Sequence, residues 1–166
     1  SDVIAPTSVP LSLAVVLWAG GGRPALLISD SGTLVGAMTS EGRALSRERG
    51  AGFVARVWLE NDGQAGGQAV AAGLWPEHEQ PRVARISVAG AMVTHFQGKR
   101  AAAGFRGCGT QEVVVSSADL PDWPGCEIFD PERLARTGAV AIWPGPSGPR
   151  IETAAGQRLW HRGADR

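Results

Sequence analysis

The chain has 166 residues, with 16 basic and 16 acidic side chains, so its formal net charge at pH 7 is zero. This balance argues against a domain dedicated to nucleic-acid binding, which would be clearly basic, although it leaves room for a local basic patch. Apolar residues make up 43% and charged residues 19%, a globular composition, and the 23 glycines and 11 prolines predict short elements joined by turns.

The N-terminal part of the chain contains its most hydrophobic run, LSLAVVLWA at residues 11–19. Nine residues are too few to cross a bilayer, which takes about 20, and the run lacks the basic start of a signal peptide. It predicts a buried strand, with the trailing end of a membrane segment as the alternative. Because the chain begins with Ser1 and both of its methionines are internal, we expect it to be a piece of a longer protein.

Residues 24–29 predict a short strand, and the densest pattern in the chain follows them. Apolar and small residues alternate over residues 33–38, Glu41 and Gly42 supply a turn, and residues 43–46 can pair back against the first strand. This order predicts a β-hairpin.

From Ala51 the pattern changes to the period of a helix, which the turn-forming sequence at residues 61–63 ends. The apolar residues Phe53, Val57 and Trp58 fall on one face of this helix. We therefore predict these three side chains to be core residues around which the domain packs.

The remaining elements are short. We expect a weak helix within residues 64–75, two strands about a turn at Ala89-Gly90, a buried strand at 112–117 and closing strands at 139–143 and 150–153. Asp130 as N-cap, Pro131 at the first position and Gly138 at the end predict one further helix. Because strands and helices alternate without a fixed repeat, the predicted class is α/β, with β-rich mixed sheets and short flanking helices.

No catalytic motif is present in the sequence. His78, His95 and His161 lie too far apart for a short metal-binding motif, so we interpret them as exposed or capping residues and predict neither a catalytic metal nor a cofactor. The sequence also lacks a GxSxG nucleophile elbow and a phosphate-binding loop.

Three segments carry a resemblance to a known family. They are GTLVGAMTSEGRALSRERGAGFVARVWLENDG at residues 32–63, CGTQEVVVSSADLPDWPGCEIFDPERLARTGAVAIW at 108–143 and RIETAAGQRLWHR at 150–162. In order and spacing they resemble the C-terminal soluble domain of ComEC, the inner-membrane DNA-uptake channel of natural competence, in its alphaproteobacterial form. The chain departs from that pattern in lacking a further cysteine pair and in having FDPERL in the last helix.

The resemblance implies a reduced metallo-β-lactamase-like domain on the periplasmic face of the inner membrane. Residues 1–23 would be a linker or edge strand after a membrane region, and residues 24–166 a single soluble domain. The HxHxDH motif of catalytic relatives is absent, so we expect a non-catalytic domain that shapes or guards the channel and contacts the transported DNA and the membrane portion of its parent protein. A metal-dependent nuclease and a protein-interaction module without DNA contact are the alternatives.

The two cysteines, Cys108 and Cys126, lie 18 positions apart around the strand at residues 112–117. In the oxidising periplasm that the resemblance implies, a disulfide between them would contribute about 3 kcal/mol. Two buried free thiols are the alternative.

Arg43, Arg47 and Arg49 form the tightest basic cluster in the sequence, and such a cluster can bind DNA phosphates. Glu41 and Glu48 lie among them, so a solvated, self-paired surface is the competing interpretation. Five tryptophans could stack on bases, although their apolar neighbours favour core positions for most of them: Trp58, Trp75, Trp123, Trp143 and Trp160.

Overall fold

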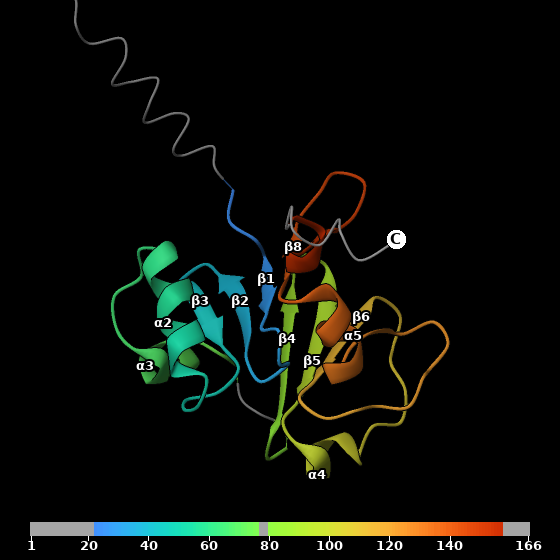
Figure 1. Ribbon diagram of the computed structural model, residues 1–166. Coiled ribbons are helices and arrows are strands. Elements are labelled where there is room, and N and C mark those ends of the chain that lie inside the picture. The colour runs from blue at the N-terminus through green and yellow to red at the C-terminus, as the bar shows by residue number, and fades with distance from the viewer. Residues whose placement is uncertain (1–21, 77–79, 158–166) are drawn as a thin grey trace, which may run out of the picture.

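The structure is a computed structural model that describes residues 22–76 and 80–157. It contains two β-sheets with short helices around them (Figure 1). The mixed α/β class is therefore as predicted. The apolar run at residues 11–19, His78, Trp160 and His161 lie outside the described residues, as does nearly all of the expected linker at residues 1–23.

The first sheet has five antiparallel strands in the order β3-β2-β1-β8-β9. Its strands are β1 (Leu26–Ile28), β2 (Val35–Thr39), β3 (Gly42–Leu45), β8 (Val140–Trp143) and β9 (Arg150–Thr153). β2 and β3 form the hairpin that the alternating pattern predicts, with Met38 opposite Arg43.

The second sheet has four strands in the order β4-β5-β6-β7. They are β4 (Val83–Val88), β5 (Ala91–Phe96), β6 (Glu112–Ser116) and β7 (Glu127–Phe129). β4 and β5 are antiparallel, whereas β5, β6 and β7 run parallel. The connection from β5 to β6 contains the four-residue helix α4 (Lys99–Ala102), which lies beyond the ends of β4 and β5 (Figure 1). The sequence pattern does not predict β7, whose three residues are too few to show a strand period.

The turn between β4 and β5 lies at Ala89-Gly90, as predicted. Both residues have positive φ angles, 49° and 80°, which is the conformation of a two-residue type I′ hairpin turn. Its twist matches that of the strands it joins.

The main core lies between the two sheets. Alternate residues of each sheet point inward, including Leu26, Ile28 and Val35 from the first sheet and Ile86, Val93, Val115 and Phe129 from the second. These side chains form one buried cluster, so burial of apolar surface holds the sheets together.

The helices α2 (Gly52–Asn61) and α3 (Gln68–Ala72) lie beside β2 and β3 (Figure 1). They form a second apolar cluster on the other face of the first sheet, made by Leu34, Leu45, Ala55, Leu59 and Ala71. Within the described residues, no helix is both long enough and apolar enough to cross a membrane.

The core prediction for α2 needs correction. Phe53 is 71% exposed and is not a core residue, and Val57 is only half-buried. Trp58 is also half-buried, but it packs against the second cluster. The buried residues are Ala55 and Leu59, because the helix turns about 100° per residue and Phe53 therefore lies far around from Ala55.

The helix α5 (Pro131–Thr137) begins and ends as the sequence predicts. The Asp130 side chain accepts a hydrogen bond from the Arg133 backbone N–H at 3.0 Å, and Gly138 follows the last turn with φ 68°. Leu134 is the buried residue of this helix and joins the main core.

Candidate nucleic-acid interface

Arg43, the first residue of the predicted DNA-binding cluster, is completely buried, with no exposed surface. Its Nε donates to Asp62 Oδ2 at 2.6 Å and its Nη2 to Asp62 Oδ1 at 3.2 Å, while Nη1 donates to the carbonyl of Pro24 at 3.1 Å. The prediction that Arg43 contacts DNA is therefore wrong. Its guanidinium is used to hold β3 against the end of α2.

Arg47 and Arg49 lie in the loop between β3 and α2, where Arg47 is half-buried and Arg49 is exposed. Both line an open cavity of about 780 Å³. Arg47 Nη1 also reaches the Thr33 carbonyl at 3.4 Å. The structure thus brings two of the three predicted arginines together at one cavity.

Arg82 is a third arginine on the wall of this cavity, and it is not among the residues predicted from the sequence. It directly precedes β4, in the second sheet, while Arg47 and Arg49 belong to a loop of the first. Pro81 marks a turn in the sequence, but no local signal shows which distant loop that turn faces. We call this cavity the arginine pocket; its lining residues are Ser46, Arg47, Glu48, Arg49, Gln80, Pro81, Arg82, Gln97, Gly98 and Ser117.

The arginine pocket lies where several strands end. Ser46 follows β3, Gln97 and Gly98 follow β5, and Ser117 follows β6. The carboxyl ends of parallel strands are the usual place for ligand sites in mixed α/β sheets. Hydrogen bonds fix these ends to one another: Gln97 Nε2 donates to the Ser46 carbonyl at 2.7 Å, and the Gly98 N–H donates to Ser117 Oγ at 2.8 Å.

A buried polar network continues behind the pocket. His95 Nε2 lies 2.9 Å from the Gly32 carbonyl, so this nitrogen carries the proton, and in the neutral ring Nδ1 accepts from the Ser46 hydroxyl at 2.9 Å. Ser46 Oγ in turn accepts from the Val35 N–H at 3.0 Å. His95 is completely buried, so the expectation of an exposed or capping histidine is wrong for it. The network links β5 of one sheet to β2 and β3 of the other.

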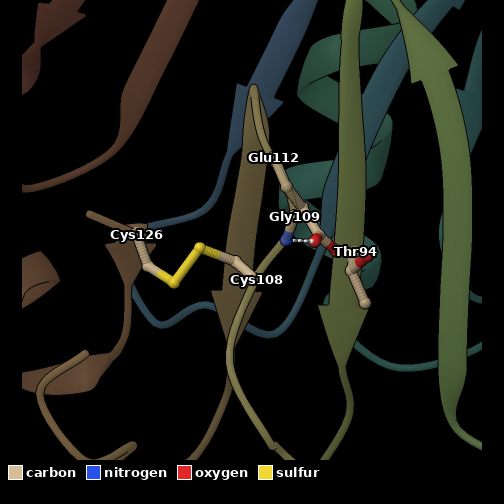
Figure 2. The surroundings of a disulfide bond; sticks show 5 residues. All are labelled: Thr94, Cys108, Gly109, Glu112 and Cys126. Atoms are coloured by element: carbon tan, nitrogen blue, oxygen red, sulfur yellow. Dashed lines mark hydrogen bonds between the residues drawn. A yellow bond between two sulfur atoms is a disulfide. The ribbon is translucent and has the colours of Figure 1, made fainter. Parts of the chain in front are cut away.

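The predicted disulfide between Cys108 and Cys126 is present, with their Cα atoms 5.7 Å apart (Figure 2). It joins the loop before β6 to the segment before β7. The same loop is held by Glu112, whose carboxylate accepts from the Gly109 N–H at 2.6 Å and from the Thr94 hydroxyl at 2.5 Å (Figure 2). Neither cysteine lines the arginine pocket.

The described tryptophans do not form a base-stacking surface at the pocket. Trp75 is buried and donates to the Arg85 carbonyl at 3.1 Å. Trp123 is 45% exposed but packs edge-on against Phe105, with ring centroids 5.8 Å apart. None of the described tryptophans lines the arginine pocket.

Within residues 22–76 and 80–157, no group of three or more His, Cys, Asp or Glu side chains is placed to hold a metal ion. Comparison of the chain with protein-family models, with curated proteins and with solved structures finds no match. We therefore infer the chemistry of the arginine pocket from its lining residues alone. They supply three guanidinium groups, one carboxylate and several neutral polar groups.

Proposed function

We propose that this chain is a non-catalytic domain of a ComEC-type DNA-uptake channel, and that it guides DNA by contacting phosphates in the arginine pocket. In this proposal the domain lies on the periplasmic face of the inner membrane as part of a larger membrane protein. It has a reduced metallo-β-lactamase-like architecture, and its partners are the transported DNA and the channel portion of its parent.

Three guanidinium groups at one cavity carry this proposal. The pocket lining contains one carboxylate, that of Glu48, and three guanidinium groups, those of Arg47, Arg49 and Arg82. Arginine binds phosphate oxygens in bidentate fashion, and phosphate contacts position nucleic acid without reading its sequence. A local excess of positive charge of this kind is compatible with a chain whose net charge is zero.

The family resemblance supplies the biological setting. Its first segment contains β2, β3 and α2, its second contains β6, β7, α5 and β8, and its third contains β9. The resembling segments therefore contribute strands to both sheets, while β1, β4 and β5 lie outside them. Arg43 and Asp62, which form the buried ion pair, both belong to the first segment.

The test is to incubate the full chain with labelled single- and double-stranded DNA in the presence of Mn²⁺. We expect a mobility shift without cleavage, which weakens as salt is raised because phosphate contacts release counterions. The triple variant R47Q/R49Q/R82Q should abolish the shift, whereas Arg56→Gln, on the exposed face of α2, should leave it unchanged.

Two outcomes would overturn the proposal. Cleavage of the DNA would replace it with the nuclease alternative. The absence of any shift at low salt would favour a protein-interaction module that does not touch DNA.

A further inference from the structure

Arg82 occupies a backbone position that arginine rarely adopts. The Val83 N–H donates to the Gln80 carbonyl at 3.2 Å, which closes a four-residue turn over residues 80–83. Pro81 fixes its own φ near −65°, and Arg82 has a φ of 65°. These angles are those of a type II turn, in which the position of Arg82 normally requires glycine or asparagine.

The surrounding structure holds this strained residue in place. The Arg82 carbonyl accepts from the Gln97 N–H at 2.8 Å, which ties the turn to the end of β5. A Cβ atom added to Gly98 would lie 3.8 Å from Arg82 Nη1, so the guanidinium extends to the neighbourhood of Gly98, on the pocket wall. Left-handed conformations of residues other than glycine are concentrated at ligand sites, where the strain serves function.

The groups around Arg82 fit an oxyanion. Ser117 Oγ accepts from the Gly98 N–H, so its own hydroxyl hydrogen can be donated to a ligand. Arg47 and Arg49 supply further guanidinium donors from the facing loop. The lining contains no aromatic ring on which a base could stack.

We propose that Arg82 is held in this turn to bind a phosphate group, and that the arginine pocket recognises the phosphate without its sugar or base. The inference rests on the assignment of the arginine pocket as the binding site in the proposed function. It adds the chemical class that is recognised and the residue on which recognition depends.

The test compares stability and binding in variants of Arg82. Arg82→Gly and Arg82→Asn remove the guanidinium and relieve the backbone, so we expect an equal or higher melting temperature together with at least a tenfold loss of affinity. Arg82→Lys keeps the charge and the strain, and its affinity should be intermediate because lysine cannot make the bidentate contact. Arg56→Gln serves as the control and should change neither quantity.

Three probes separate the sources of phosphate: inorganic phosphate, an abasic phosphodiester oligomer and oligothymidylate, each titrated by NMR chemical-shift changes. We expect all three to shift the signals of Ser117 and Gly98. The abasic oligomer should bind within about threefold of oligothymidylate, since stacking of even one base would otherwise raise the affinity for oligothymidylate by about fivefold or more. A lower melting temperature for Arg82→Gly, or an affinity for phosphate within twofold of the original chain, would contradict the inference.

The probes also keep the two proposals apart. Binding of inorganic phosphate that depends on Arg82, without binding of either oligomer, would support the inference and remove the DNA-guiding function. If instead oligothymidylate binds with the same affinity to the Arg82 variants, and the abasic oligomer does not bind, the inference is wrong and the DNA-guiding function stands.

Discussion

Arg43 and Asp62 form a bidentate ion pair with Nε–Oδ2 and Nη2–Oδ1 distances of 2.6 and 3.2 Å. Arg43 is completely buried and the Asp62 side chain is only 8% exposed. The pair joins β3 to the residue that follows α2, and Gln64 strengthens the link by accepting from the Arg43 N–H and donating to its carbonyl. The hairpin and the helix are therefore held together by paired polar groups as well as by apolar packing.

Asp62→Ala should strongly destabilise the protein, because it leaves a buried guanidinium without its counter-charge. We expect a loss of about 3 to 5 kcal/mol in the free energy of unfolding, measured by urea denaturation. Glu60→Ala removes an exposed i,i+4 pair with Arg56 and should cost no more than about 0.5 kcal/mol. A double variant, R43M/D62L, should be less damaging than Asp62→Ala alone, and equal losses for the two would contradict this account.

Gly36→Ala should also destabilise the protein, because Gly36 makes room for the Arg43 side chain. A Cβ atom on Gly36 would lie 2.8 Å from Arg43 Cδ and 3.1 Å from the Trp58 ring. We expect a loss of about 1 to 3 kcal/mol from this overpacking, measured by thermal denaturation. At Gly52, where an added Cβ would meet only the Gln68 side chain at 4.0 Å, the same substitution should stabilise α2 by up to about 1 kcal/mol. If both alanines stabilised the protein, the steric explanation for Gly36 would be wrong.

Ser46→Ala should weaken the contact between the two sheets. The substitution removes the acceptor of the Val35 N–H and the hydroxyl that faces His95 Nδ1. Each buried polar group that loses its partner costs about 1 to 3 kcal/mol, so a loss of about 2 to 4 kcal/mol is expected in urea denaturation. Ser31→Ala is the matched control, since Ser31 is exposed and its hydroxyl bonds to the Thr33 side chain. A change at Ser46 no larger than the change at Ser31 would show that the network contributes nothing to stability.

Removal of the disulfide should destabilise the protein without changing the arginine pocket. The double variant C108S/C126S should lose about 3 kcal/mol, as expected for a closed loop of this length. The oxidised chain should migrate differently on a gel after reduction, and it should present no titratable thiols when denatured. Two thiols in the unreduced, denatured chain would contradict the bond, and a loss of DNA binding in the double variant would show an unexpected link to the pocket.

Ala89→Asn should stabilise the hairpin of β4 and β5. Ala89 has a φ of 49°, a left-handed conformation that costs most residues about 1 to 2 kcal/mol and asparagine less. A gain of about 0.5 to 1 kcal/mol is expected from thermal denaturation. Ala135→Asn, on the exposed side of α5, should have the opposite sign because asparagine is a poorer helix former than alanine. Destabilisation by both substitutions would contradict the type I′ assignment.

The sequence by itself determined the features that depend on neighbouring residues. The hairpin of β2 and β3, the turn at Ala89-Gly90 and the capped helix α5 were all predicted at nearly their observed places. Each depends on backbone preferences or alternation within a few residues, and such preferences act before any distant contact forms. Cys108 and Cys126 are the two cysteines of the chain, and the prediction that they pair came from the oxidising location that the family resemblance implies.

Only the tertiary structure decided which side chains are buried and which meet at a site. From the sequence, Arg43 is expected to be a solvated cation like Arg47 and Arg49. Its burial depends on the ion pair with Asp62, which lies 19 positions further along the chain. The exposure of Phe53 depends on how α2 is rotated against the sheet, which small core residues such as Ala55 set. Arg82 joins Arg47 at the pocket because the start of β4 in one sheet lies near the loop that follows β3 in the other. Pairing and packing between distant segments create these relationships, so no local pattern could have contained them.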